Sequence, residues 1–339
     1  MPTARAPGRV TLIGDHTDYN GGLSLTMAID LATEATYTPD PGSFLISLSS
    51  DQFDVPWEIP LGGTAPSHAQ AVLAAGLIRQ AQPQSGGAVR VTSTLPMGAG
   101  LSSSAAFSVA LLMALGDQSD PLTRAKRCQQ AEAEAGAHVG LLDPLSIAGA
   151  QAGHALSIDF ATLETHPVPI PGSAAFVIVH SGATRVLGAS PYATRRAECD
   201  LAAKYLGRSL GTCQLADLSA LPTQILRRRA RHVVTECARV REVERLLARG
   251  NLVRIGALMT EGHRSLAEDF RVSTPDIDEL VSNLTQLPGV YGARMTGGGF
   301  GGCVIALCAP DSPALDPETH APRRAWRVSP SPGAALLAT

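Results

Sequence analysis

A glycine- and serine-rich stretch is the first place where the residue types and spacing of this sequence could do chemistry. Residues 95–106 read LPMGAGLSSSAA. Gly98 and Gly100 lack a Cβ atom, so the backbone can take positive φ and a ligand can come close to its N–H groups. The serines at 102–104 stand where a helix should begin, where cap hydroxyls, unpaired amides and the positive end of the helix dipole meet. The stretch therefore predicts an anion site, with phosphate as the ligand.

A plainer explanation of this stretch stays open. A G-x-G before a helix can be an ordinary connection in which a serine caps the helix. The two common nucleotide motifs do not apply, because no lysine follows as in the P-loop and Ser103 occupies the third glycine position of G-x-G-x-x-G. The three serines after G-x-G-L favour phosphate binding.

A turn rich in polar side chains follows the N-terminal apolar residues. Residues 14–22, the polar turn, read GDHTDYNGG and place Asp15, His16, Asp18 and Asn20 between glycines. Four side chains that donate or accept hydrogen bonds can surround a polyhydroxylated ligand. The alternative is a plain turn rich in aspartate and asparagine, and this segment alone does not decide between the two.

Asp143 is a third candidate because it stands between apolar Leu142 and Pro144. A carboxylate in apolar surroundings is costly unless it is paired or used in chemistry. It could also cap the helix that follows, with proline at the first helical position. Taken in isolation, the cap is the favoured interpretation.

A second glycine-rich segment, residues 297–303, reads GGGFGGC. Packing alone does not account for five glycines around one aromatic residue, since each glycine adds chain entropy that folding must overcome. The segment predicts a close approach of its backbone to a ligand or to the first glycine-rich stretch.

Alternating strands and helices must position these segments. A strand over 89–93 leads into the first glycine-rich stretch, and a buried helix over 107–115 leaves it. Residues 31–50 alternate in polarity, which predicts paired antiparallel strands with Phe44, Ile46 and Leu48 on one face. The remaining patterns predict strands over 10–13, 153–159, 174–180, 304–307 and 325–328, the last of the chain, and helices over 67–80, 121–136, 227–248, 252–269 and 275–287, with a further helix beginning at 191–199.

The composition indicates a soluble globular protein, with 45% hydrophobic and 17% charged residues in 339. A formal charge of −3 argues against a general polyanion binder. We expect the arginine-rich segment 227–232 to be the solvated start of a helix rather than a nucleic-acid patch. Six scattered cysteines without a C-x-x-C pair predict reduced thiols in a cytoplasmic protein, without a disulfide framework or a zinc site. Neither a secretory signal nor a membrane-spanning run is expected.

Three segments together resemble the signature motifs of the GHMP small-molecule kinases in order and spacing. They are residues 5–22, 96–106 and 296–303, and the first, RAPGRVTLIGDHTDYNGG, is similar to the signature of the galactokinase family. Further matches extend the resemblance from Arg5 to about Leu307, at residues 190–196, 229–234 and 263–273.

The resemblance implies an α+β protein with the two-domain GHMP kinase fold. Residues 1–172 would form a ribosomal S5 domain 2-like N-terminal domain and residues 173–339 a ferredoxin-like C-terminal domain, with the active site between them. The implied reaction is the MgATP-dependent phosphorylation of the anomeric hydroxyl of galactose. The implied partners are the sugar and ATP, with Mg²⁺ as cofactor. Neither nucleic acid nor a membrane is expected as a partner, and the chain is expected to be a monomer.

The resemblance also implies roles for individual residues, by position. Arg9 and Asp143 would flank the reacting hydroxyl, and other sugar contacts would come from Asp15, His16, Asp18, Gly140 and Tyr192. The ATP phosphates would lie against Pro96, Gly98, Ala99, Gly100, Leu101, Ser102, Ser103 and Ser104, and the magnesium ligands would be Ser104 and Glu132.

These residue types suit phosphoryl transfer, which needs positioning and charge neutralisation more than covalent help. The permanent charge of Arg9 would keep Asp143 ionised. An ionised Asp143 can orient the hydroxyl and accept its proton, either as a true base or late in a dissociative transition state. One hydroxyl and one carboxylate suit Mg²⁺, which keeps water and phosphate ligands.

Three departures from the family pattern leave other functions open. Asp15 stands where glutamate is usual, Pro144 stands where glutamine is usual, and the interval from Glu132 to Asp143 is one residue short. The first two allow a GHMP kinase for another sugar, and the third weakens the assignment of Glu132 to the metal. A regulator that senses sugar without turnover is a further alternative, against which the presence of both Arg9 and Asp143 argues.

Overall fold

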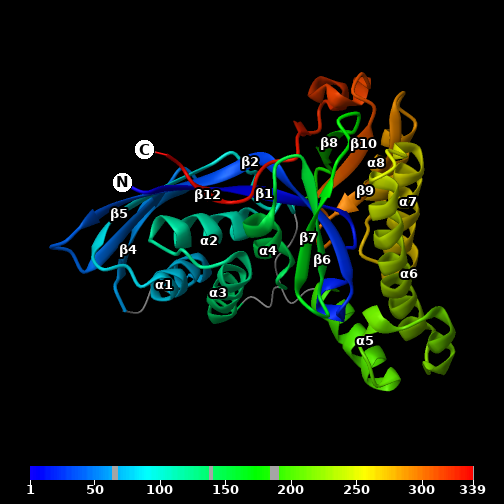
Figure 1. Cartoon of the computed structure of the whole chain (residues 1–339), viewed down its shortest axis with the longest axis horizontal. Coiled ribbons are helices and arrows are strands. Elements are labelled where there is room, and N and C mark those ends of the chain that lie inside the picture. Colours follow the sequence, from blue (N-terminus) through cyan, green and yellow to red (C-terminus); the bar gives the residue numbers. More distant parts are fainter. Residues whose placement is uncertain (63–67, 137–139, 184–190, 339) are drawn as a thin grey trace.

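Two β-sheets, each packed against helices, make up the protein (Figure 1). A computed structural model describes residues 1–62, 68–136, 140–183 and 191–338. In these residues the larger sheet has eight strands, in the order β12-β1-β2-β5-β3-β4, with β6 paired to β2 and β7 paired to β6. The strands are β1 (Thr3–Ile13), β2 (Leu23–Asp40), β3 (Leu45–Ser50), β4 (Phe53–Pro60), β5 (Gly86–Ser93), β6 (His154–Asp159), β7 (Glu164–Pro169) and β12 (Ala335–Leu336).

The smaller sheet is antiparallel throughout, in the order β11-β8-β10-β9. Its strands are β8 (Ala175–His180), β9 (Val290–Thr296), β10 (Cys303–Cys308) and β11 (Ala325–Val328). Strands β1 to β7 therefore lie in one sheet and β8 to β11 in the other, while β12 returns to pair with β1.

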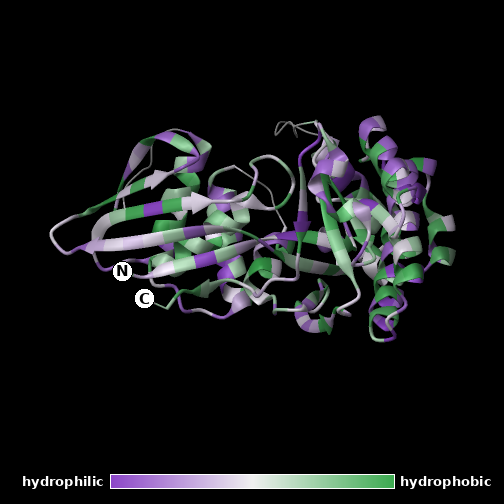
Figure 2. Cartoon of the chain, turned by 90° about the horizontal axis from the view of Figure 1, so that it is seen from above, coloured by the Kyte–Doolittle hydropathy of each residue, from purple (hydrophilic) through white to green (hydrophobic). Residues whose placement is uncertain are grey.

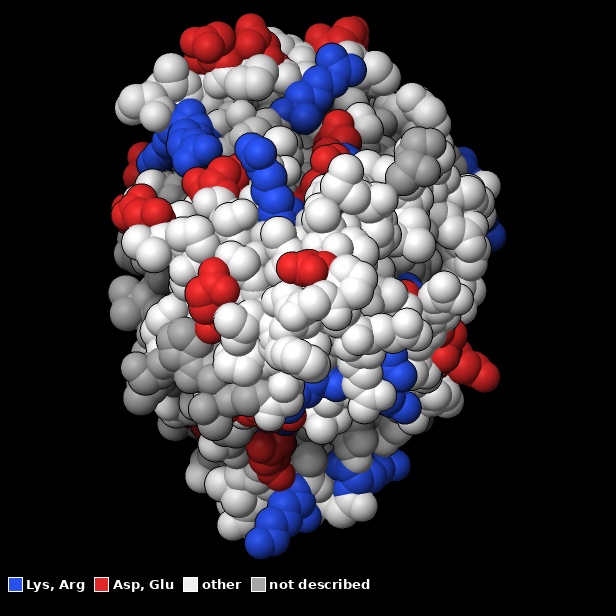
Figure 3. Space-filling model, turned by 90° about the vertical axis from the view of Figure 1, so that its left-hand side faces the viewer, with Lys and Arg blue, Asp and Glu red and all other residues white. Residues whose placement is uncertain are grey.

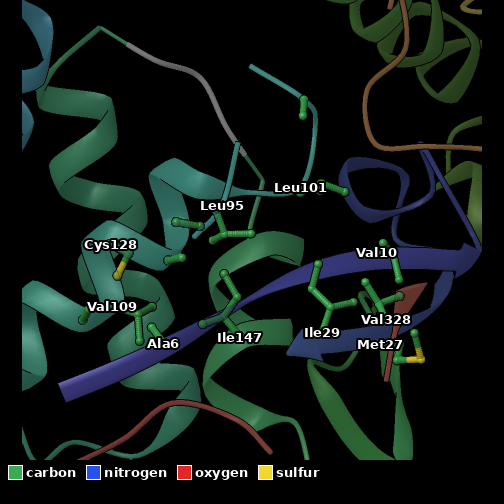
Figure 4. Packing of buried hydrophobic residues seen from close by; sticks show 14 of the residues in the cluster. Ala6, Val10, Met27, Ile29, Leu95, Leu101, Val109, Cys128, Ile147 and Val328 are labelled. Carbon is green, nitrogen blue, oxygen red and sulfur yellow. The ribbon is translucent and has the colours of Figure 1, made fainter. Parts of the chain in front are cut away.

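Helices α1 (Ala69–Ala81), α2 (Ser103–Ala114) and α4 (Leu142–Gly149) pack against the larger sheet, and α3 (Pro121–Glu134) packs on these helices. Helix α2 is almost wholly apolar because it is enclosed, with β1 and β2 on one side and α1, α3 and α4 around it. Figure 4 shows Val109 of α2 and Ile147 of α4 among the buried residues of β1 and β2. The first glycine-rich stretch thus leads into a helix that the core holds in place.

The C-terminal half adds the helices α5 (Pro191–Leu206), α6 (Gln224–Leu247), α7 (Leu252–Ser265) and α8 (Pro275–Thr285). Helix α6 is amphipathic, with Val233 and Val240 buried and several arginines on its outer side. Figure 2 shows hydrophilic and hydrophobic residues mixed along the helices at this end of the molecule. Short helical turns complete the chain, at Asp18–Asn20, Leu210–Thr212, Leu215–Ala220, Leu266–Phe270, Pro313–Leu315 and Pro317–His320.

Helix α7 and strand β9 touch backbone to backbone at a pair of glycines. A Cβ atom on Gly292 would lie 1.9 Å from the carbonyl oxygen of Gly256, and one on Gly256 would lie 2.2 Å from the carbonyl carbon of Tyr291. Neither position has room for a side chain, so this contact fixes the distance between α7 and β9.

Several expectations about the elements are wrong. Residues 31–50 do not form a pair of strands, because β5 lies between β2 and β3, and β3 runs parallel to β5. Ile46 and Leu48 are buried, but Phe44 precedes β3 and is 81% exposed. Strands β7 and β12 were not expected, and β12, not residues 325–328, is the last strand. The sequence of β12 is too short for a period to show.

The arginine-rich segment 227–232 starts a long helix as expected, but it is not wholly solvated. Arg229 is 4% exposed and pairs with Glu198 at 2.6 Å, and His232 is fully buried. The expected helix over 252–269 is α7 followed by a wider π-helical turn, Leu266–Phe270. Residue 190, the first of the matched segment 190–196, lies outside the described residues.

The surface carries both signs of charge. On the face seen in Figure 3, basic and acidic side chains are interspersed around uncharged residues. Among the described residues, we find no helix with both the length and the apolar character that a membrane span requires. All six cysteines are free and buried.

Candidate active site

Asp143 lies at the centre of the candidate site, in the first turn of α4. It does not cap the helix, because Leu141 occupies the N-cap position, so the favoured interpretation from its sequence context is wrong. Its oxygens are used instead by Arg9, whose Nε donates to Oδ1 at 2.8 Å, and by the Ser102 hydroxyl, which donates to Oδ2 at 2.7 Å. The side chain remains 36% exposed, so a substrate can reach it.

Arg9 joins Asp143 to the first glycine loop, residues 96–104. Its Nη2 lies 2.6 Å from Asp143 Oδ1, and its Nη1 donates to the carbonyl oxygen of Gly100 at 2.8 Å. Strand β1 can pass this close to the loop because residue 8 is glycine, where a Cβ atom would lie 2.4 Å from Leu95 Cδ2. The arginine is 5% exposed, which makes its charge effective because little water screens it.

The first glycine loop has the conformation that an anion site needs. Gly98 and Gly100 have φ of +72° and +79°, and Ser102, at +62°, is the N-cap of α2. The helical hydrogen bonds begin with the amide of Ala106, which donates to the carbonyl oxygen of Ser102. The amides before Ala106 therefore have no acceptor within the helix. Such amides at the start of a helix can donate to a phosphate group.

The second glycine loop, residues 297–302, packs against the first. A Cβ atom on Gly297 would lie 3.1 Å from the carbonyl oxygen of Gly100, and one on Gly302 would lie 3.1 Å from that of Ala99. The expected close approach between the two glycine segments is confirmed.

Ser104 and Glu132 lie together on the outer side of the loop. The exposed Ser104 hydroxyl donates to Glu132 Oε1 at 3.1 Å, whereas Glu132 is 7% exposed. Burial raises the pKa of Glu132 to about 7, with the charge of Asp143 adding to the rise. A buried carboxylate beside a hydroxyl is a donor set that a hard cation such as Mg²⁺ would stabilise.

The burial of Glu132 has a measurable consequence for stability. Its raised pKa means that the folded state resists ionisation, so the carboxylate destabilises the ligand-free protein above pH 7, and this cost fades as the pH falls towards 4.5. Glu132→Gln is therefore expected to stabilise the ligand-free protein at pH 8, by up to about 3 kcal/mol, and much less at pH 5. Thermal melting at the two pH values measures this difference.

Glu134→Gln is the matched control for that variant. Glu134 lies two residues away on the same helix and forms a partly exposed pair with Arg79. Its replacement is expected to change the melting temperature little at either pH, since exposed pairs contribute about 0–1 kcal/mol. A Glu132→Gln variant that melts below the wild type at pH 8 would contradict the argument.

The polar turn faces the site with aromatic support. His16 is 5% exposed with φ of +64°, and its Nδ1 lies 3.0 Å from the hydroxyl oxygen of Tyr19. Its ring lies 5.6 Å from that of Tyr192 and 4.7 Å from that of Phe270. Residues from the turn, α5 and the π-helical turn thus form one wall.

Asp18 lies against Gly140, on the approach to α4. A Cβ atom on Gly140 would lie 2.0 Å from Asp18 Oδ2, so a side chain at this position would displace the Asp18 carboxylate. Burial raises the pKa of Asp18 to about 6, and the charge of Asp143 adds to the rise. Asp143 therefore acts electrostatically on Asp18 in the polar turn and on Glu132 beside the glycine loop.

Asp15 occupies a more buried position, with 3% exposure. Its Oδ2 lies 2.8 Å from Arg294 Nη2, and its Oδ1 accepts the amide hydrogen of Gly297 at 3.0 Å. Burial raises the pKa of Asp15 to about 6, although the charge of Arg294 opposes this rise. The carboxylate thus connects the polar turn to the second glycine loop.

Known proteins share both the sequence and this arrangement. Family models match at residues 2–39 (galactokinase galactose-binding signature), 68–149 (GHMP kinases N terminal domain) and 243–321 (GHMP kinases C terminal). The galactokinase of Bos taurus is 42% identical over 325 residues, which cover 89% of this chain and 82% of the bovine one. That of Mycobacterium tuberculosis is 41% identical, over 90% and 88% of the two chains.

The chain belongs to the galactokinase family. The crystal structure of Lactococcus lactis galactokinase complexed with galactose matches it with a TM-score of 0.89 and 28% identity, over 99% of this chain and 95% of that one. The GHMP kinase fold expected from the three motifs is thereby confirmed.

The structure also shows buried residues beside the site that sequence reasoning missed. Arg294 on β9, with no measurable exposure, and Glu236 on α6 form a buried ion pair at 2.8 Å. His232 lies beside them, with Nε2 3.1 Å from the carbonyl oxygen of Asp15, and burial lowers its pKa to about 4. The available signal was an arginine in the middle of an otherwise apolar strand, 290–296.

Proposed function

We propose that this chain transfers the γ-phosphoryl group of ATP to the anomeric hydroxyl of galactose. The relatives over most of the chain are galactokinases, and one solved relative is a galactose complex. The observation that carries the proposal is the position of Asp143, held by Arg9 and Ser102 between the polar turn and the first glycine loop. The Asp143 carboxylate would therefore lie between a sugar bound at the polar turn and ATP phosphates bound at the first glycine loop.

Asp143 would orient the attacking hydroxyl and accept its proton. Its bonds to Arg9 and Ser102 fix the carboxylate, while Oδ2 keeps a further lone pair for a sugar hydroxyl. Arg9 would stabilise the negative charge on the transferring phosphoryl group, and its bond to Gly100 would keep it aligned with the loop.

The first glycine loop would hold the ATP phosphates. We propose that Pro96, Gly98, Ala99, Gly100, Leu101, Ser102, Ser103 and Ser104 line them, with backbone amides at the start of α2 as donors. Ser104 and Glu132 would hold Mg²⁺, which neutralises phosphate charge when it is bound. Removal of divalent cations is accordingly a test of the donor set.

The sugar would lie between the polar turn and α5. We propose that His16, Asp18, Gly140 and Tyr192 contact its hydroxyls, and that Asp15 does so from the buried end of the turn. The aromatic wall around His16 and the close contact of Asp18 with Gly140 support this assignment, because they bring the polar turn against α5 and the segment before α4.

A panel of sugars tests the acceptor. Galactose is expected to give the highest kcat/KM in an assay that couples ADP release to a measured signal, with glucose, an N-acetylated hexosamine, a uronic acid and a pentose as comparisons. The second candidate, a GHMP kinase for another sugar, is favoured by Asp15 and Pro144, which replace the usual glutamate and glutamine. A higher kcat/KM for any other sugar would select that candidate.

We also propose that the chain divides into two domains, 1–172 and 173–339. The two sheets support this division, although β12 returns from the second part to the first. We propose a monomer in the cytoplasm, and its six free cysteines are what a reducing compartment allows.

A further inference from the structure

Arg294 is a fully buried charged side chain near the site, and the proposed reaction does not use it. It lies on β9 with no measurable exposure, and its Nη2 is 2.8 Å from both Asp15 Oδ2 and Glu236 Oε1. Burying a guanidinium is costly unless good partners repay the loss of water. Two carboxylates at hydrogen-bond distance are such partners, so the cluster has a defined geometry.

Each carboxylate of this cluster also holds a backbone amide of a loop. Glu236 Oε1 accepts the amide hydrogen of Gly14 at 2.9 Å, and Asp15 Oδ1 accepts that of Gly297 at 3.0 Å. Gly14 begins the polar turn, and Gly297 begins the second glycine loop. One guanidinium therefore ties the turn, that loop and α6 together.

Helix α7 packs directly against the guanidinium at a glycine. A Cβ atom on Gly262 of α7 would lie 2.7 Å from Arg294 Nη1 and 3.1 Å from Glu236 Oε2. Burial raises the pKa of Glu236, but Arg294 and Arg239 outweigh it and hold that pKa below its usual range. Arg239 contributes from the outer side of the cluster, with Nε 2.8 Å from Glu236 Oε2.

We propose that Arg294 is a positioning residue for the sugar acceptor. Through Glu236 and Asp15 it holds both ends of the Gly14–Asp15 peptide, so the next residues, His16 to Asp18, present their side chains to the sugar in one conformation. The first glycine loop on the ATP side also has anchors that do not pass through Arg294, namely the bond from Arg9 to Gly100 and the packing of α2. This inference rests on the proposed function, because it assigns the polar turn to the sugar.

Binding measurements without turnover test the role. Arg294→Met is expected to raise the Kd for galactose by about tenfold, which corresponds to a turn held correctly in about a tenth of the molecules. The Kd for a non-hydrolysable ATP analogue with Mg²⁺ should stay within about twofold, because its anchors are intact. Arg294→Lys should recover part of the sugar affinity, since one ammonium can pair with one carboxylate. Isothermal titration calorimetry gives each constant.

Arg239→Gln is the matched control. It removes the other arginine of Glu236 but leaves the bonds to Gly14 and Asp15, so the galactose Kd should remain within about twofold of the wild type. If Arg294→Met does not fold, Gly262→Ala tests the same contact, because the added methyl group must displace the guanidinium while all charges remain. It should raise the Kd for galactose and spare that for the analogue.

The outcomes separate this inference from the proposed function. A folded Arg294→Met variant that binds galactose like the wild type overturns the positioning role alone. An equal loss of affinity for galactose and the ATP analogue also overturns it, since that is the result of general destabilisation. A wild-type protein that binds the analogue but not galactose overturns the proposed function and the inference together.

Discussion

Replacing Asp143 with asparagine should lower kcat by about a thousandfold, the middle of the range for losing a positioned proton acceptor. Asparagine keeps the shape of the side chain and an oxygen for Arg9, but it cannot take a proton from the hydroxyl. The Kd for galactose should change little by comparison, because most sugar contacts are proposed to come from the polar turn, Gly140 and α5. Coupled measurement of ADP release and calorimetric titration with galactose give the two quantities.

Asp143→Ala extends this test, and Asp200→Asn controls for it. The alanine variant should abolish turnover and leave galactose binding measurable, which also tests whether a bound sugar needs the carboxylate. Asp200 is exposed on α5, so its replacement should leave both quantities as in the wild type. An Asp143 variant that loses no more than about one order of magnitude in kcat would refute the assigned role.

Replacing Arg9 with lysine is expected to have the second-largest effect, a loss of about a hundredfold in kcat. The guanidinium contacts Asp143 through two nitrogens and Gly100 through the third. A single ammonium cannot keep this planar arrangement, although it keeps the charge. The proposed base and the glycine loop would then lose their common anchor, and the analogue Kd should also rise.

Arg5→Lys is the control on the same strand. Arg5 is more exposed, and it contacts Glu34 and the carbonyl oxygen of Asp30 on β2, away from the glycine loop. Its variant should show wild-type kcat and a wild-type Kd for the analogue. If Arg9→Lys has the same kcat and the same Kd for the ATP analogue as Arg5→Lys, the proposed role of Arg9 beside the phosphates is wrong.

The sequence predicted much of the site because its chemistry lies in local motifs. The glycine loop before α2 and the polar turn are short segments whose residue types indicate their local conformation. The structure confirms both the positive φ angles and the start of the helix. The three motifs also pointed to the GHMP kinase fold, which the comparisons confirm.

Contacts between residues far apart in the chain could not be predicted from the sequence. The local context of Asp143 favoured a helix cap, whereas its partner Arg9 lies 134 residues earlier. The parallel pairing of β3 with β5, the return of β12 to β1 and the enclosure of Arg294 by Asp15 and Glu236 depend on contacts between distant segments. Hydrophobic periodicity indicates whether a segment is a helix or a strand, but not which distant segment it contacts.

The glycine pair at positions 256 and 292 is expected to make the enzyme sensitive to substitutions away from its site. Gly292 and Arg294 are two residues apart on β9, so both face the same side of the sheet. A single methyl group at Gly256 or Gly292 would push the strand from α7 and carry Arg294 with it. We expect a saturation mutagenesis screen to find these two positions as intolerant as Asp143, so that inherited loss of activity can arise far from either substrate.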